Sequence, residues 1–464
     1  MRRILKNCVI SSMITAICAL GAAPAAAQDR DAERALLEQI VEIPTVAGRG
    51  EMPRLVALLR SELGQAGFDR FNVQQHDDTE TLIARRLADQ PSGEGPILLM
   101  AHMDVVDADP NDWQNPPFDF REEEGYYLGR GVRDNKAGLT GMVLAMQRLE
   151  ASGFASDRDL IVLFTGDEET LQNGARLAAS EWRELIEADV ALNSDGGGGS
   201  VFRDGRVEGF FVQIAEKTYA DFQFRVTNRG GHSSRPRPDN AIYQLAAALT
   251  GVERHRFPHQ LNDATRISYE MLAANDDGFY GQLVRSWLDD PDNGEIADLI
   301  ESLEPGQTRT RCVATEISGG HAPNALPQSA QATVNCRIFP GTPVENIQQT
   351  LQTIAGQHVE VSLMEGSGAW SDPSPIDEAL FAAYGRALAV RFPDAPIIPF
   401  MSAGATDAIF TRAAGIPTYG IGGTWGISGE ASGAHGLDER VLVEGFHGSV
   451  DIWEALLRDL AGAE

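Results

Sequence analysis

An acidic triplet at residues 167–169 closely follows an apolar segment, residues 160–164. His102 and Asp104 follow a second apolar segment, residues 97–101. In an open α/β sheet, ligands bind at the carboxyl ends of the strands, so both groups should face one site. Clustered carboxylates repel one another unless a cation or a proton lies among them. The pattern therefore predicts a metal site that activates water.

Five residues at loop or strand-end positions carry metal-binding groups: His102, Asp134, Glu169, Asp195 and His435. Imidazole and carboxylate ligands without a thiolate suit zinc, manganese or cobalt in a hydrolytic site. Two ions about 3.5–4 Å apart need a bridging carboxylate, so five ligands suffice if one is shared. Each residue alone could be a solvated or helix-capping side chain. The metal site is favoured because three of the groups follow apolar strands.

In their order along the chain, these residues resemble the co-catalytic zinc hydrolases of metallopeptidase family twenty. That family includes aminoacylase, succinyl-diaminopimelate desuccinylase, carnosine dipeptidase and glutamate carboxypeptidase. The resemblance covers nearly all of the chain after residue 27, and it rests on residues 102–104, 129–136, 167–169, 194–195, 230–234, 337–341, 404–407 and 434–436. It implies two bound Zn²⁺ ions, with Co²⁺ or Mn²⁺ as alternatives.

The resemblance also implies how the ligands are shared. Asp134 would bridge the two ions, His102 and Asp195 would complete one site, and Glu169 and His435 the other. The family pattern further implies a general base, Glu168, which takes a proton from water and passes it to the leaving amine. Asp104 would accept a hydrogen bond from the free ring nitrogen of His102 and so set its tautomer.

A second set of residues is implied to contact the substrate. His232 would stabilise the oxyanion, often from the partner subunit of a dimer. Arg337 would bind a substrate carboxylate with help from Asn324, as a guanidinium fork suits that group. Backbone N–H groups at Gly404 and Thr406 would bind the same carboxylate.

The chain departs from the family pattern at two places. Arg133 and Asn135 stand where the family often has smaller or apolar residues. Ala405 replaces a glycine that is common at its position, which could narrow the substrate pocket.

Helical and strand-like segments alternate over residues 31–193, which predicts an α/β domain with a mostly parallel sheet. After the glycine run at residues 196–199, alternating strands and helices predict a strand–helix–strand–strand–helix–strand domain. An acidic helical segment, residues 263–303, interrupts it. Helix–strand alternation resumes from residue 376. We therefore expect a zinc-hydrolase catalytic domain interrupted by a smaller, ferredoxin-like α+β lid and dimerisation domain, divided as residues 28–212, 213–367 and 368–464.

Residues 1–27 have the features of a secretory signal peptide: a basic start, a short apolar run and a small-residue cleavage site. We therefore expect export to a bacterial periplasm or the extracellular space, with no membrane attachment after cleavage. Three of the 38 basic residues and no acidic residue lie there, so the rest holds 35 basic against 67 acidic residues, a net charge of −32. Such an acidic chain excludes nucleic acid and anionic membrane as expected partners.

Two cysteines remain after residue 27, Cys312 and Cys336. In an exported protein they could form a disulfide, and they could equally stay as buried free thiols. The sequence leaves both states open.

Together these features predict a secreted dinuclear zinc hydrolase that cleaves an amide bond next to a free carboxylate, in a dipeptide or at a peptide's C-terminus. An N-acyl-amino-acid deacylase is the alternative among enzymes, and an aminopeptidase would need an acidic group for a free amine that the sequence does not identify. A non-catalytic peptide-binding periplasmic protein is the alternative from another class, and an intact Glu168 argues against it. A homodimer through the lid domain is the expected assembly.

Overall fold

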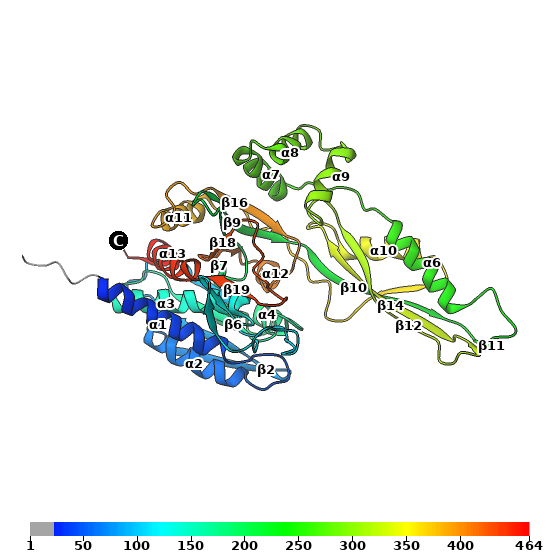
Figure 1. The fold of residues 1–464 in the computed structure, drawn as a ribbon, viewed down its shortest axis with the longest axis horizontal. Helices are drawn as coiled ribbons and strands as arrows, with labels where there is room; N and C mark the ends of the chain where they lie inside the picture. Colours follow the sequence, from blue (N-terminus) through cyan, green and yellow to red (C-terminus); the bar gives the residue numbers. More distant parts are fainter. Residues whose placement is uncertain (1–22, 464) are drawn as a thin grey trace, which may run out of the picture.

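A computed structural model describes residues 23–463 (Figure 1). The chain forms a large part built on a ten-stranded sheet and an elongated part built on a four-stranded sheet. Residues 1–22 of the predicted signal peptide lie outside the described residues. Within the described part, no helix has the length and apolar character needed to cross a membrane.

The central sheet is mixed, with a parallel group of strands at its core and both parallel and antiparallel pairs further out. The pairs β6–β3, β3–β7 and β7–β17 run parallel, whereas β1–β2, β2–β6 and β8–β9 run antiparallel. In spatial order the strands are β1 (Arg70–His76), β2 (Thr79–Arg86), β6 (Leu160–Thr165), β3 (Ile97–His102), β7 (Val190–Asn193), β17 (Thr418–Gly420), β9 (Val207–Glu216), β8 (Gly198–Val201) and β18 (Trp425–Ile427), with β16 (Ile397–Ser402) beside β9. The predicted α/β class is confirmed.

Helices cover both faces of this sheet because alternate residues of its inner strands point to opposite sides. Along β3, Ile97, Leu99 and Ala101 join one core, and Leu98 and Met100 join the other. The first core is covered by α1 (Ala23–Val41), α2 (Met52–Gln65), α3 (Ala137–Ala151), α11 (Glu378–Leu388) and α13 (Val443–Ala461). The second is covered by α4 (Asn173–Ala179) and α5 (Arg183–Ile186), with α12 (Ala408–Ala413) packed beside α4.

The elongated part holds an antiparallel sheet in the order β12–β14–β10–β15 with α6 and α10 packed on it. Its elements follow one another along the chain as β10 (Thr218–Thr227), α6 (Ala241–Arg254), β12 (Arg311–Gly319), β14 (Ser329–Ile338), α10 (Val344–Ala355) and β15 (Glu360–Leu363). This is the connectivity of a ferredoxin-like sheet. Cys312 and Cys336 are opposite each other on β12 and β14 and form a disulfide. The division at residues 213 and 367 stays a prediction.

The acidic segment is helical, as the sequence predicts, and forms α7 (Asp263–Asn275), α8 (Phe279–Asp289) and α9 (Gly294–Leu303). These helices have a small core of their own around Trp287 and Ile300. They do not simply enlarge the four-stranded sheet, because α7 packs against β16 of the central sheet.

Small sheets complete the fold. One joins β4 (Arg121–Glu123), β5 (Tyr126–Leu128) and β19 (Arg440–Leu442). The other joins β11 (Gly231–His232) to β13 (Ala325–Leu326), and β11 lies at the outer end of the elongated part (Figure 1).

Candidate metal centre

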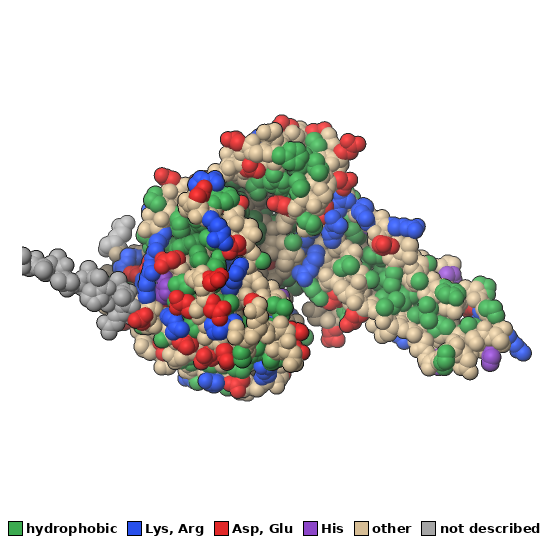
Figure 2. Space-filling model, in the orientation of Figure 1, with side chains coloured by type: hydrophobic (Ala, Val, Ile, Leu, Met, Phe, Trp, Pro, Cys, Tyr) green, Lys and Arg blue, Asp and Glu red, His purple; other side chains and the backbone are tan. Residues whose placement is uncertain are grey.

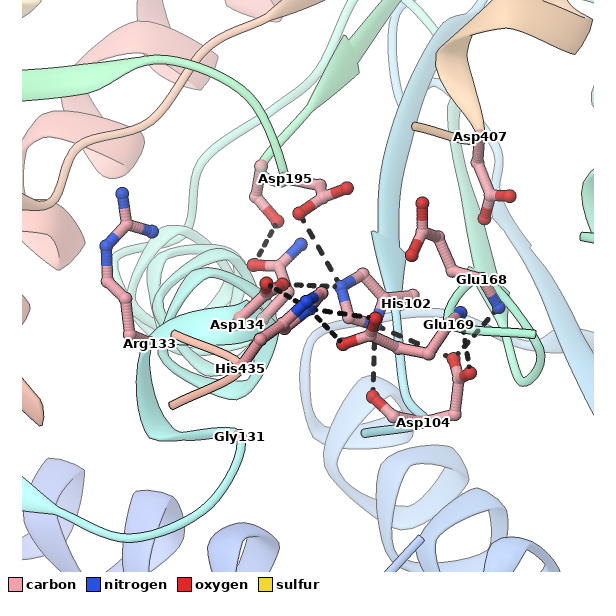
Figure 3. A network of polar contacts seen from close by, with 12 residues as sticks. His102, Asp104, Gly131, Arg133, Asp134, Glu168, Glu169, Asp195, Asp407 and His435 are labelled. Carbon is pink, nitrogen blue, oxygen red and sulfur yellow. Dashed lines mark hydrogen bonds and ion pairs between the residues drawn. The ribbon is translucent and has the colours of Figure 1, made fainter. Parts of the chain in front are cut away.

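The five predicted ligands lie together at the carboxyl ends of the central strands (Figure 3). His102 is the last residue of β3, Glu169 follows β6, and Asp195 follows β7. Asp134 lies in a tight turn at Val132–Lys136 before α3, and His435 lies in the loop before β19. The structure thus brings together groups from five separate segments.

Asp134 lies between the two imidazoles. Its Oδ1 is 2.9 Å from Nε2 of His102, and its Oδ2 is 3.2 Å from Nε2 of His435. One carboxylate therefore presents a different oxygen to each histidine. This is the arrangement that a carboxylate shared by two cations requires.

Each histidine also has a carboxylate of its own. Nε2 of His102 is 3.5 Å from Oδ1 of Asp195, and Nε2 of His435 is 2.9 Å from Oε2 of Glu169. The donor atoms in each of the two groups, His102–Asp134–Asp195 and Asp134–Glu169–His435, lie within 4.8 Å of one another. Imidazole nitrogen and carboxylate oxygen, with no thiolate, fit a pair of divalent cations.

Asp104 supports the centre in a different way from the predicted one. Nδ1 of His102 is 3.0 Å from the backbone carbonyl oxygen of Asp104, and 3.6 Å from its carboxylate. The carbonyl can only accept, so Nδ1 carries the proton and Nε2 offers its lone pair to a metal. The Asp104 carboxylate accepts backbone N–H bonds from Glu168 at 3.1 Å and Glu169 at 3.0 Å. It therefore fixes the turn that holds both glutamates.

The electrostatics of the centre follow from burial and crowded charge. Burial raises the pKa of Glu168 well above its usual value, and the negative charge of Asp195 raises it further. Burial opposes ionisation of Asp134, but hydrogen bonds from His102 and His435 outweigh it and lower its pKa. Hydrogen bonds to Asp134 and Glu169 raise the pKa of His435 to about 10. The group thus combines strong cation affinity with one carboxyl poised to exchange a proton.

The loop that carries Asp134 is held by Glu439, a fully buried residue that the sequence analysis did not select. Its Oε1 accepts the N–H groups of Arg133 at 2.8 Å and Asp134 at 2.9 Å. Its Oε2 accepts the N–H of Gly131 and Nη1 of Arg130, at 2.8 and 2.7 Å. The only signal in the sequence is that an acidic residue follows His435 by four positions.

We expect Glu439→Gln to weaken metal binding about 10- to 100-fold, the usual effect of losing a group that orients a ligand. The amide has one acceptor oxygen in place of two and would point an N–H₂ group at N–H donors. Metal affinity measured by chelator competition checks this. Glu430→Gln, the same change in a residue that does not touch the Asp134 loop, should keep normal affinity. Equal affinities for both variants would contradict the role of Glu439.

Arg337 lies on β14 on the face opposite to Cys336, which is buried in the core of the four-stranded sheet. Its guanidinium stacks 4.6 Å above the Tyr219 ring. Partial burial lowers the pKa of Arg337, and the charges of Asp221, Glu216 and Glu168 oppose that change. Arg337 is opposite Tyr219, three residues after the end of β9, and so lies at the end of β14 nearest the central sheet.

His232 and Asn324 are neighbours of each other but not of the metal ligands. Both are exposed at the outer end of the elongated part, where β11 pairs with β13 (Figure 1). Nδ1 of His232 accepts the N–H of Ser234 at 3.2 Å, so Nε2 carries the ring proton of the neutral form and can donate. Within one chain these residues do not reach the centre.

The Gly404 and Thr406 N–H groups already have acceptors. Gly404 donates to the Ser402 hydroxyl at 3.0 Å. Thr406 donates its N–H and its hydroxyl to Oε2 of Glu216, at 3.0 and 2.9 Å. Glu216 is buried and forms an ion pair with Arg412 at 2.6 Å. In this arrangement neither N–H is free for a substrate carboxylate, contrary to the prediction.

The neighbouring Asp407 is a further residue that the analysis of candidate sites missed. It is buried, accepts a hydrogen bond from Thr165 at the end of β6, and lies close to Glu168 (Figure 3). Burial raises its pKa well above the usual value, and the nearby charges of Asp167 and Asp104 raise it further.

Comparisons with known proteins agree with this geometry. The model of peptidase family M20/M25/M40 matches residues 98–459. The N-fatty-acyl-amino acid synthase/hydrolase PM20D1 of Homo sapiens is 27% identical over 447 residues, covering 91% of this chain and 86% of the relative.

Two solved structures show the same fold. An M20 family metallo-carboxypeptidase from Sulfolobus solfataricus has a TM-score of 0.69 at 18% identity, covering 92% of this chain and 98% of that one. The YXEP protein of Bacillus subtilis, a dinuclear metal-binding peptidase from the M20 family, has a TM-score of 0.59 at 12% identity, covering 93% and 98%. This chain thus belongs to the M20/M25/M40 peptidase family, whose members are metal-dependent hydrolases of peptide or amide bonds.

Proposed function

We propose that the protein is an exported dinuclear zinc hydrolase that cleaves an amide bond next to a free carboxylate, in a dipeptide or at a peptide's C-terminus. The observation that carries the proposal is Asp134, which directs its two oxygens at two imidazoles, 2.9 and 3.2 Å away. The B. subtilis relative is described as dinuclear, which supports two ions. Zinc is the metal that best suits this mixed imidazole and carboxylate set.

The chain's own residues can then perform the hydrolysis. When bound, two divalent cations would polarise the scissile carbonyl and lower the pKa of a water molecule. Glu168, fixed through its backbone by Asp104 and through Oε1 by Gln172 at 2.9 Å, takes the proton of the attacking water. The same carboxyl passes that proton to the leaving amine. Arg337 holds the carboxylate of the amine product.

A second copy of the chain is part of the proposal. His232 can donate from Nε2 to an oxyanion, but it lies far from the centre of its own chain (Figure 1). Hydrophobic side chains gather on the elongated part that holds α6 and β12 (Figure 2), and Ile242, Tyr243 and Ile317 are exposed there. A dimer through this face would cover them and would bring His232 to the partner's centre.

Two observations support export. Residues 1–27 have the pattern of a signal peptide. The disulfide between Cys312 and Cys336 is a bond that persists in oxidising compartments.

N-acyl-amino-acid hydrolysis is the second candidate because the human relative bears that name and aligns with 91% of this chain. Its substrate class has the same free carboxylate next to the amide. The two candidates differ only in what lies on the acyl side of the scissile bond.

Substrate profiling tests the proposal. Zinc-reconstituted protein is incubated with dipeptides, longer peptides and N-acyl amino acids, and the products are identified by mass spectrometry. We expect cleavage one amide from a free carboxylate and no cleavage of substrates that lack one. Hydrolysis that starts only at free amino termini would exclude both candidates.

Arg337→Ala should raise KM about 10- to 100-fold for substrates with a free carboxylate, the value of a charged hydrogen-bonded pair. The same substrates with an amidated C-terminus should be hydrolysed poorly by the unmodified enzyme, and the substitution should change their KM little. Arg225→Ala removes an exposed arginine of the neighbouring strand β10 and is the matched control. An equal loss on free and amidated substrates would show that Arg337 does not bind the carboxylate.

A further inference from the structure

A pocket of about 180 Å³ lies beside the metal centre and has no part in the function described above. It is bordered by the loops that carry three of the ligands. Arg133 precedes Asp134, Gly197 follows Asp195 by two residues, and Ser432 precedes His435 by three. A molecule in the pocket would therefore lie next to the centre.

The pocket and the general base lie on opposite sides of the centre. Figure 3 shows Arg133 on one side of His102 and Asp134, and Glu168 with Asp407 on the other. Arg337 belongs to that second side, because it is opposite Tyr219, three residues after Glu216, and Glu216 holds Thr406 next to Asp407. An extended substrate with its carboxylate at Arg337 and its amide at the centre would send its acyl part towards Arg133.

Arg133 carries the one positive charge of the pocket that has no counter-charge. Its backbone N–H donates to Glu439, but its guanidinium forms no ion pair or hydrogen bond with any residue of the described range 23–463. The side chain is held in the pocket, with Nη2 4.0 Å from the position that a Cβ on Gly198 would take. A partly buried guanidinium without a partner is poorly solvated, so an anion that reaches it is bound strongly.

The other charged groups of the pocket are already paired. Arg440 stacks 4.6 Å above the Tyr126 ring and lies 3.5 Å from Glu430. Glu430 also accepts a hydrogen bond from the Tyr126 hydroxyl at 2.7 Å and pairs with Arg203. The surplus positive charge therefore lies at Arg133, in a chain whose net charge is −29.

The walls and the size of the pocket limit what can accompany that anion. Phe211, Trp425 and Ile427 supply apolar surface. The volume of about 180 Å³ equals roughly six water molecules at ~30 Å³ each, enough to hold a short carbon chain.

We propose that Arg133 selects substrates whose acyl part ends in a carboxylate. The substrate class is an amide between a short acyl group with a second carboxylate and an amino acid whose own carboxylate is bound at Arg337. This inference rests on the proposed function and deepens it, since it assigns the acyl side of the scissile bond. It gives a role to a residue at which the chain departs from its family.

Two substrates of equal length test the proposal: one amino acid acylated with a butanoyl group or with a 3-carboxypropanoyl group. For the intact enzyme we expect kcat/KM to favour the carboxylate-bearing substrate about 10- to 100-fold, the worth of one charged hydrogen-bonded contact. Arg133→Gln should bring that ratio close to one. Arg225→Gln removes the same charge from an exposed position on β10, away from the pocket, and should keep the preference. The ratio compares two substrates on one protein, so a partly misfolded variant does not distort it.

The possible failures are distinguishable. Equal kcat/KM for both substrates on the intact enzyme, or a preference for long apolar acyl groups, overturns the role of Arg133 and leaves the amide hydrolase intact. If neither substrate is hydrolysed, the proposed function fails on these amides. Binding of the 3-carboxypropanoyl compound, measured by calorimetry, then tests whether Arg133 binds the acyl carboxylate. Binding that weakens at least tenfold in Arg133→Gln supports the role of Arg133, and binding unaffected by the substitution overturns that role.

Discussion

Glu168→Gln should lower kcat by roughly 10²- to 10⁴-fold while the protein keeps the two metal ions of the proposed centre, because the amide cannot accept a proton. The fold around the residue should persist. Asp104 holds the backbone N–H groups of Glu168 and Glu169, at 3.1 and 3.0 Å, and these contacts do not involve the substituted carboxyl. The measurement is kcat on the best substrate from the profiling experiment, together with metal content by mass spectrometry.

Glu181→Gln is the matched control, since it makes the same change in an exposed residue of the segment between α4 and α5 and should have wild-type kcat. A variant at Glu168 with two bound ions and near-normal kcat would remove this residue from the mechanism. Loss of metal together with activity would instead assign Glu168 to the ligands.

Asp134→Asn should abolish dinuclear metal binding. Oδ1 faces His102 and Oδ2 faces His435, so an amide can keep an oxygen on one side only and presents an N–H₂ group to the other. We expect the affinity for metal to fall by more than the 10- to 100-fold typical of groups that only orient a ligand. Activity should be lost in parallel, and exhaustive chelation of the native protein should have the same effect.

Asp195→Asn provides the comparison, because Asp195 belongs to the ligand group of His102, 3.5 Å from its Nε2, and not to that of His435. Loss of the Asp195 carboxylate should lower the affinity for one ion and leave the affinity for the other unchanged, whereas the Asp134 variant should lose both ions. Metal stoichiometry by mass spectrometry separates these outcomes. An Asp134 variant that retains two tightly bound ions would show that the carboxylate is not shared.

Much of the fold could be predicted because it depends on local patterns. The unbroken apolar run at residues 97–101 is the pattern of a strand buried on both faces, and the structure has helices on both sides of it. The helix predicted at residues 344–355 is α10, and the acidic segment after residue 263 is helical. Hydrophobic periodicity and helix-capping residues act over a few positions, so the sequence contains this information directly.

Contacts between distant segments were not predictable in the same way. The sequence leaves open whether Cys312 and Cys336 are joined, and the register of β12 on β14 decides it. The predicted use of the Gly404 and Thr406 N–H groups overlooked Glu216, which is 190 residues from Thr406 and takes both of its donors. Buried polar groups find partners wherever the fold supplies them, and no local pattern records which partner that is.

The sequence by itself determined the chemical character of the site: which residues can bind cations, and that His102, Glu169 and Asp195 follow buried strands. The tertiary structure alone decided how these side chains are oriented and which groups they contact. It turned the two oxygens of Asp134 towards histidines from distant segments and set Glu439 against the backbone of that turn. It left Arg133 without a counter-charge among residues 23–463 and placed His232 far from the centre of its own chain. The type of a side chain is a local property, but its orientation and its partners are set by packing and hydrogen bonds between segments far apart in the chain.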